Sequence, residues 1–114
     1  MSRPAQKRAF GVAAGLPEEV CGPLAAAVQD AGYDSIWAND HPFAKGLETL
    51  AQFAGAADDI DLGVAVIALD RQGADVIAED IKRLDLDPSR LWIGVGAGFS
   101  KKPLTFMTER ISEL

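Results

Sequence analysis

The stretch Asp61-Leu-Gly-Val-Ala-Val-Ile-Ala-Leu69 decides the fold class, because it is apolar almost throughout. A continuous apolar run of this length is typical of a strand that is buried on both faces of a parallel sheet. Shorter apolar runs at 9–14, 35–39 and 91–97 predict three more strands of the same kind. The chain therefore carries four candidate strands at regular intervals.

The first segment between strands predicts a helix that ends near Ala31, before Gly32. Two prolines are candidates for the first turn of this helix. Pro17 is followed by two glutamates, which suits a helix N-terminus, and Pro23 is the alternative first-turn residue. The apolar stripe of this helix is expected at Leu24, Ala27, Val28 and Ala31.

Two further segments have apolar residues at helical spacing and predict helices over 45–57 and from 72 to about 86. In the second of these, Asp80 is expected to face away from the core. The residues expected to face inward are Val76, Ile77, Ile81 and Leu84. A last segment, 104–114, predicts a short helix.

Strands thus alternate with helices, which implies a parallel sheet covered by helices. A doubly wound sheet and a TIM (βα)8 barrel both use this pattern. A complete barrel needs roughly 200 residues or more, and the chain has 114. We expect an α/β fold that is a partial TIM barrel: about four βα units, parallel strands in sequential order, and a single incomplete domain over 1–114.

Composition excludes several classes of function. The net charge of −6 argues against a nucleic-acid binder, which needs a basic surface. Cys21 is the only cysteine, so neither an internal disulfide nor a cysteine metal cluster can form. We expect Cys21 to be structural. Neither a targeting segment nor a membrane span is evident, and we expect a cytoplasmic protein with a small-molecule substrate.

Asp40 and His41 are the first candidates for chemistry, because they directly follow the second predicted strand. Ligands of parallel α/β folds bind at the carboxyl ends of the strands. An imidazole there can donate a hydrogen bond or move a proton near neutral pH. Such residues are also common in ordinary loops after strands, so position alone does not establish a role.

The run Gly94-Val-Gly-Ala-Gly98 is the second candidate, because its glycines recur at every second position and share one face of a strand. That face either admits a flat ligand or packs closely against a neighbouring strand. It is not a dinucleotide fingerprint, because Phe99 and Lys101 break that pattern. Gly63 can mark a bulge, although an ordinary core strand is the favoured interpretation. Trp37 and Trp92 are expected in the core.

Four segments taken in order are more specific than any one of them. They are Ala31-Gly-Tyr-Asp-Ser-Ile-Trp37, Asn39-Asp-His-Pro42, Asp61-Leu-Gly-Val-Ala-Val66 and Arg90-Leu-Trp-Ile-Gly-Val-Gly-Ala-Gly98. Together they resemble the luciferase-like monooxygenase family of FMN- and F420-dependent oxidoreductases. The resemblance runs from about residue 10 to about residue 103 and covers the N-terminal half of the family's usual length.

The resemblance implies a (βα)8 barrel with the cofactor at the carboxyl ends of the strands. It places His41 beside the reactive ring with Asp40 as its neighbour, and a non-prolyl cis peptide behind the ring near Ala65-Val66. The end of the fourth strand, Ala97 and Gly98, would also approach the ring. F420 is favoured by the Trp37–His41 run and the short loops, with FMN as the alternative.

Two features depart from the family pattern. Phe99 stands where some sugar-phosphate dehydrogenases of the family have an acidic residue, which puts that activity in doubt. The loops that hold the cofactor phosphate belong to the half that this sequence does not contain. We therefore expect a hydride-transferring oxidoreductase or monooxygenase fragment that is not active alone, completed by a homo-oligomer or by the missing C-terminal half. The alternatives are a non-catalytic truncated product or a half-barrel that self-associates, and a small doubly wound binding domain.

Overall fold

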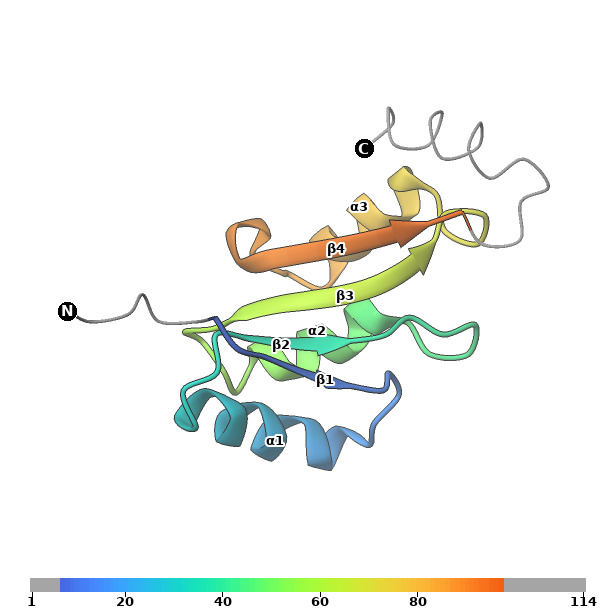
Figure 1. Cartoon of the computed structure of the whole chain (residues 1–114). Coiled ribbons are helices and arrows are strands. Elements are labelled where there is room, and N and C mark those ends of the chain that lie inside the picture. Colours follow the sequence, from blue (N-terminus) through green and yellow to red (C-terminus); the bar gives the residue numbers. More distant parts are fainter. Residues whose placement is uncertain (1–6, 98–114) are drawn as a thin grey trace.

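A computed structural model describes residues 7–97 of the chain (Figure 1). Strands and helices alternate along these residues, as the apolar pattern predicts. The strands are β1 (Ala9–Val12), β2 (Ser35–Ala38), β3 (Asp61–Ala68) and β4 (Leu91–Gly96). The helices are α1 (Glu18–Asp30), α2 (Gly46–Ala54) and α3 (Ala74–Arg83), with a 3-10 turn, η1 (Pro88–Arg90), before β4. The last predicted helix, 104–114, lies outside the described residues.

The four strands form one parallel sheet in the order β1-β2-β3-β4. Each strand pairs with the next one in the chain, and β1 and β4 are the two edges (Figure 1). A doubly wound sheet would change direction along the strand order, whereas sequential order is that of a barrel segment. The expected fold class is confirmed.

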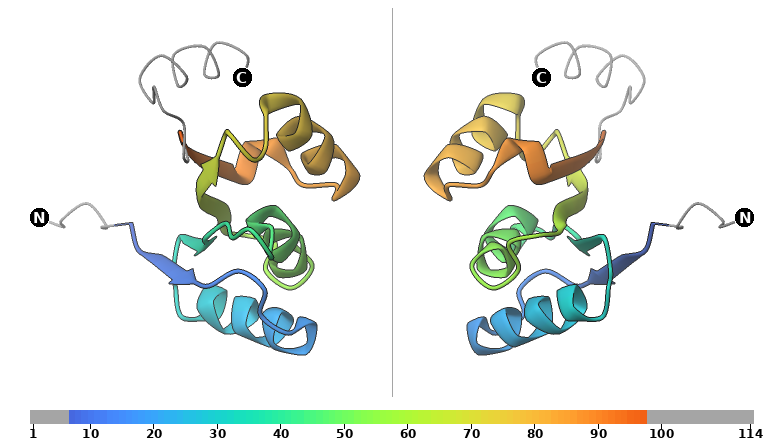
Figure 2. Two further views of the ribbon diagram at one scale, coloured as in Figure 1. Left: turned by 90° about the vertical axis from the view of Figure 1, so that its right-hand side faces the viewer. Right: turned by 90° about the vertical axis from the view of Figure 1, so that its left-hand side faces the viewer.

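The helices α1, α2 and α3 lie on one face of the sheet (Figure 2), and the hydrophobic core fills the space between the two layers. The largest side chains of this core are at most 1% exposed. They include Ile36, Leu47, Leu50, Phe53, Leu62, Val64 and Ile67. Within residues 7–97, no helix covers the opposite face, which we call the open face. No helix in this range is long and apolar enough to cross a membrane.

The first helix begins after Pro17, because the backbone N–H groups of Val20 and Cys21 already donate to the Pro17 carbonyl. Pro23 therefore lies inside α1, and its assignment to the first turn is wrong. The stripe prediction is right for the buried Val28 and the partly buried Leu24. It is wrong for Ala27 and Ala31, because the sheet contacts the side of α1 that carries Cys21 and Ala25.

Asp80 is a second correction, because its side chain does not face solvent but lies buried between α3 and the start of α2. The Lys45 ammonium, 2.9 Å from its carboxylate, and the Arg83 guanidinium, 3.2 Å away, compensate its charge there. The spacing within α3 could not reveal this, because Lys45 lies 35 residues earlier in the chain. The expected inward residues of α3 are buried or partly buried.

Candidate functional site

A hollow of about 430 Å³ lies at the carboxyl ends of β1 and β2, beside Ala65 in the middle of β3. This is the end of a parallel sheet at which α/β proteins bind ligands. Gly11 borders open space in this hollow, because a Cβ added to it would meet no atom within 4 Å. The lining residues are Gly11, Val12, Ala13, Trp37, Ala38, Asn39 and Ala65. The hollow is thus mostly apolar, with one amide at its rim.

A bulge in β3 forms one wall of this hollow. The register with β4 shifts between Val64 and Ile67, so Ala65 and Val66 project from the regular ladder. The peptide bond between them is cis, at the position that the resemblance implies. Val66 is 50% exposed. Gly63 pairs in regular register with Trp92 and is buried, so the favoured interpretation as a core-strand residue is confirmed and the bulge alternative is wrong.

The glycines of β4 face this bulge. A Cβ on Gly94 would lie 3.1 Å from the Ala65 Cβ, and one on Gly96 would lie 2.8 Å from the Val66 Cγ1. The close-packing interpretation of the alternating glycines is therefore confirmed for these two positions. Ala97 follows β4 directly, and Gly98 lies outside the described residues.

Trp37 and Trp92 lie on the open face. A Cβ on Gly63 would collide with the Trp37 indole, so this glycine makes room for the ring. The indole N–H of Trp37 donates to the Ser35 hydroxyl at 2.9 Å, and that of Trp92 donates to the Asp61 carboxylate at 3.0 Å. Trp92 is 56% exposed, and Trp37 is only partly buried and lines the hollow, so the expected place of both indoles in the core is wrong for the chain as described.

A second hollow of about 410 Å³ lies at the amino ends of the strands. It shares Trp37 with the first hollow and combines charged residues of both signs with the two indoles. Its lining residues are Lys7, Arg8, Ala9, Asp34, Ser35, Trp37, Asp61 and Trp92. Ligands of this architecture bind at the other end of the sheet, so this hollow is not the primary candidate.

His41 lies in a tight turn after β2. The turn is closed by two backbone hydrogen bonds between His41 and Ala44, at 3.0 and 3.1 Å. The Phe43 backbone N–H donates to His41 Nδ1 at 3.1 Å, so the neutral imidazole carries its proton on Nε2. The ring is exposed and does not line the hollow. His41 comes two residues after Asn39, which lines the hollow.

Asp40 points into the protein, with only 1% of its side chain exposed. Its carboxylate accepts hydrogen bonds from the Gly46 backbone N–H at 2.9 Å, the Gln72 amide at 3.0 Å and the Arg71 guanidinium at 3.2 Å. The structure thus turns the two candidates in different directions. The imidazole of His41 is available to a ligand, whereas the Asp40 carboxylate is occupied.

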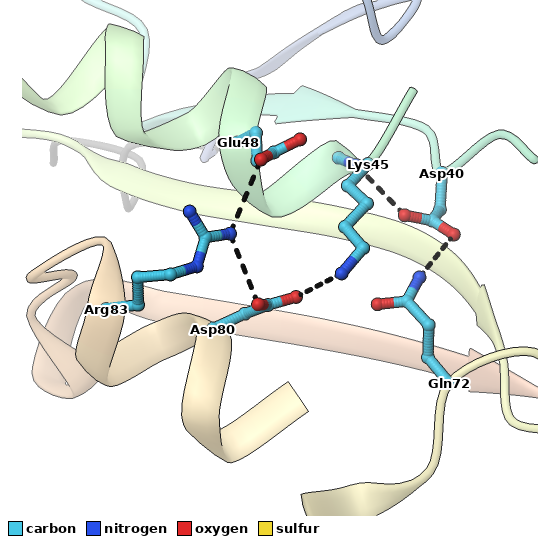
Figure 3. Close-up of polar contacts among 7 residues, drawn as sticks. Asp40, Lys45, Glu48, Gln72, Asp80 and Arg83 are labelled. Carbon is cyan, nitrogen blue, oxygen red and sulfur yellow. Dashed lines mark hydrogen bonds and ion pairs between the residues drawn. The ribbon is translucent and has the colours of Figure 1, made fainter. Parts of the chain in front are cut away.

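Sequence reasoning missed Lys45, Arg71 and Gln72 as neighbours of the candidate pair. Figure 3 shows Gln72 directed at Asp40, and Lys45 directed at Asp80. The only available signal was a polar Asp-Arg-Gln run directly after the third strand. That run does not identify a partner about 30 residues earlier.

Cys21 agrees with its structural assignment. Its side chain is fully buried, and Sγ lies 3.7 Å from the Leu16 carbonyl oxygen. Burial raises the pKa of the Cys21 thiol, and the nearby charges of Glu18 and Glu19 raise it further. A thiol that stays protonated is a poor nucleophile and metal ligand. Within residues 7–97, no group of three His, Cys, Asp or Glu side chains could hold a metal ion.

The sequence profile described as luciferase-like monooxygenase matches residues 12–113. The chain belongs to the luciferase-like monooxygenase family. The match covers β2, the β3 bulge and β4, so the turn and all the lining residues of the hollow except Gly11 lie within the family region. Comparison with curated proteins gave no significant match.

Two solved structures share the fold of this luciferase-like chain. One is a coenzyme F420-dependent tetrahydromethanopterin reductase from Methanopyrus kandleri, with a TM-score of 0.69 and 21% identity over 90% of this chain. The other is apo-MsnO8, with a TM-score of 0.62 and 21% identity over 93% of this chain. This chain spans 30% and 37% of their respective lengths. The described residues therefore correspond to a portion of the family barrel.

Proposed function

We propose that this chain forms the ring-binding part of an oxidoreductase that transfers hydride through F420, with FMN as the alternative cofactor and a small molecule as substrate. The observation that carries the proposal is the mostly apolar hollow at the carboxyl ends of β1 and β2, beside the bulge of β3. Family membership and the F420-dependent reductase among the similar structures support the choice of cofactor. The lone buried thiol is compatible with a cytoplasmic location.

The described residues fit the ring of such a cofactor. A flat ring needs a surface without protruding side chains, and Gly11 and Ala65 provide one within the hollow. In this proposal Ala65 and Val66 form the wall behind the ring, and Ala97 approaches it from the end of β4. The family resemblance adds Gly98, which lies outside the described residues. The cofactor, when bound, supplies the hydride chemistry, and the protein supplies binding and orientation.

His41 is the proposed catalytic residue, because the Nε2–H of its neutral ring can donate a hydrogen bond toward the reacting atoms, and its protonated ring can donate a proton from the same atom. The hydrogen bond from Phe43 to Nδ1 supports this tautomer. The Asp40 carboxylate already has three donors. We therefore assign Asp40 to holding the loop beside the ring rather than to proton transfer.

The phosphate end of the cofactor needs residues beyond the hollow. Among residues 7–97, neither Lys nor Arg lines the hollow, and Arg71 is paired with Asp40. Phosphate groups are usually held by cations or by backbone N–H groups at helix N-termini. The proposed site is therefore completed by a second copy of the chain or by the C-terminal half of the barrel.

Cofactor titration tests the proposal. F420 and FMN are each added to the protein, and binding is followed by cofactor absorbance and by quenching of the tryptophan fluorescence. Gly11→Leu should fill the hollow and weaken ring binding by at least about tenfold, or about 1.4 kcal/mol. Gly55→Leu is the matched control, because Gly55 lies on the exposed end of α2 with ordinary helical angles.

Two results would contradict the proposal. One is that neither cofactor binds to the monomeric or the associated protein. The other is that Gly11→Leu and Gly55→Leu bind the cofactor equally well, which would place the ring elsewhere.

The second candidate is a non-catalytic half-barrel that self-associates through its open face. The specific observation in its favour is the exposed Trp92 beside the β4 edge. Unpaired strand edges and exposed aromatic side chains favour association. Light scattering after size-exclusion chromatography measures the mass. A dimer that binds neither cofactor supports this candidate, and a strict monomer contradicts it.

A further inference from the structure

Five polar residues join the loop after β2 to the βα unit that follows it: Asp40, Lys45, Arg71, Gln72 and Asp80. We call this set the polar bracket. It lies at the interface between the start of α2 and the β3–α3 segment (Figure 3). Its members flank the turn that carries His41, although none of them belongs to the hollow.

The first side of the bracket holds the chain just before the turn. One oxygen of Asp40 accepts from Gln72 Nε2 at 3.0 Å and from Arg71 at 3.2 Å, and the other accepts from the Gly46 N–H at 2.9 Å. Asp40 therefore ties the end of β2 both to the start of α2 and to the loop after β3. Charge-assisted hydrogen bonds of this kind are stronger than neutral ones, especially where they are buried.

The second side holds the chain just after the turn. Lys45 is the N-cap residue of α2, and its ammonium lies 2.9 Å from the buried carboxylate of Asp80 on α3. Arg83 also contacts Asp80 and links it to Glu48 of α2 at 3.3 Å. Both ends of the turn are thus attached to the same neighbouring βα unit.

The amide of Gln72 is oriented by Asp40. Its Nε2 donates to the carboxylate, whereas its buried Oε1 has no hydrogen-bond partner among the described residues. Reversing the amide would direct the Oε1 lone pairs at a carboxylate. The orientation of the amide is therefore determined by the Asp40 contact.

Between the two held ends, the turn itself is closed by the His41–Ala44 backbone pair. Phe43 then directs its N–H at His41 Nδ1. The imidazole orientation consequently depends on the turn, and the turn depends on where Asp40 and Lys45 are held. We propose that Arg71, Gln72 and Asp80 are positioning residues that act through Asp40 and Lys45 to fix the orientation and tautomer of His41.

The use of this orientation in catalysis rests on the proposed function, but the positioning itself is testable without cofactor. His41 is the only histidine, so its two ring nitrogens give one pair of 15N resonances. At about pH 8.5 a histidine side chain is ordinarily neutral. We expect the full-length protein to show a protonated Nε2 and an unprotonated Nδ1.

Gln72→Glu is the informative variant, because it places a second carboxylate against Asp40. Like charges at this distance repel strongly in a buried position. We expect the two 15N shifts to move toward each other, as the tautomers begin to exchange. Gln52→Glu is the matched control. It makes the same chemical change at an exposed position of α2 and should leave both shifts unchanged.

The exchanged pair Asp40→Asn with Gln72→Glu provides the rescue. It returns one carboxylate and one amide to the contact and retains an oxygen for the Gly46 N–H. We expect the wild-type 15N shifts of His41 to return in this double variant. The double variant also tests the proposal if Gln72→Glu alone does not fold.

Either of two outcomes overturns the proposal. Gln72→Glu could fold, as judged by circular dichroism, and keep the wild-type 15N shifts. Alternatively, the exchanged pair could fold without restoring them. A failure to bind F420 or FMN would leave this result standing and would count against the proposed function alone.

Discussion

The two faces of the sheet differ although they are made by the same strands. On the helix-covered face, Ile36 and Leu62 are at most 1% exposed. The residues that follow them in the chain are Trp37 and Gly63, and they belong to the open face. One face therefore holds the fold together, while the other provides the hollow and carries the exposed indole of Trp92. Substitutions on the helix-covered face should therefore lower the free energy of unfolding, whereas substitutions on the open face should mainly affect binding.

The largest effect should come from the helix-covered face. Ile36→Ala removes a fully buried side chain from the middle of β2 and leaves a cavity under the helices. We expect it to lower the free energy of unfolding by about 3 kcal/mol. Urea unfolding followed by circular dichroism measures this. A loss similar to that of an open-face substitution would break the distinction between the faces.

Gly63→Ala should have the next largest effect, although Gly63 faces the other way. The added methyl group would collide with the Trp37 indole. Overpacking of this kind costs about 2 kcal/mol, and the tryptophan fluorescence should shift. Gly11→Ala is the control, because the same methyl group there has open space around it. Equal losses in the two variants would show that the cost is not steric.

A smaller effect concerns the polar contact between α2 and α3. Burial raises the pKa of Asp80, but the hydrogen bonds and charges of Lys45 and Arg83 outweigh it and hold that pKa below its usual range. Ionised Asp80 therefore stabilises the fold above the unfolded-state pKa of about 3.9. This contribution is lost as the pH falls from there through the folded-state pKa.

Asp80→Asn should remove this part of the acid dependence and cost about 1 kcal/mol at neutral pH. Urea midpoints measured at a series of pH values test it. Glu79→Gln, on the exposed side of the same helix, should leave the acid dependence unchanged. The prediction fails if the stability of the two variants follows the same pH profile.

The smallest effect on stability is expected for Trp92→Ala. The side chain is already 56% exposed, and it loses one hydrogen bond to Asp61. The free energy of unfolding should change by less than about 0.5 kcal/mol. If the chain self-associates through its open face, the same variant should shift the mass toward the monomer. A large loss of stability would mean that Trp92 belongs to the core after all.

Local sequence signals predicted the fold because they depend on nearby residues. The apolar run at 61–69 and the helical spacing over 45–57 require no knowledge of the rest of the chain. The open face was less predictable. A strand pattern shows which side chains alternate, but it does not show whether a second layer covers them, so Trp92 was assigned to the core.

The candidate site was predicted in part, for a similar reason. The place of Asp40 and His41 after β2 followed from the chain order. The direction of Asp40 did not, because its partners Arg71 and Gln72 lie 31 and 32 residues away. Asp80 was likewise misplaced, since only the fold brings Lys45 to it. Tertiary pairing of charges leaves no periodic signal in a sequence.

The sequential strand order has a consequence for how the chain folds. Ala9 pairs with Ser35, which in turn pairs with Asp61, a constant separation of 26 residues. Strands are hydrogen-bonded only to the strands next to them in the chain, as in a linear repeat array. No pairing joins the two ends of the described chain. Each closure spans a single βα unit, although parallel pairing over this separation forms more slowly than the local contacts within a helix. The sheet should therefore assemble one βα unit at a time, and its edge units should be the first to open.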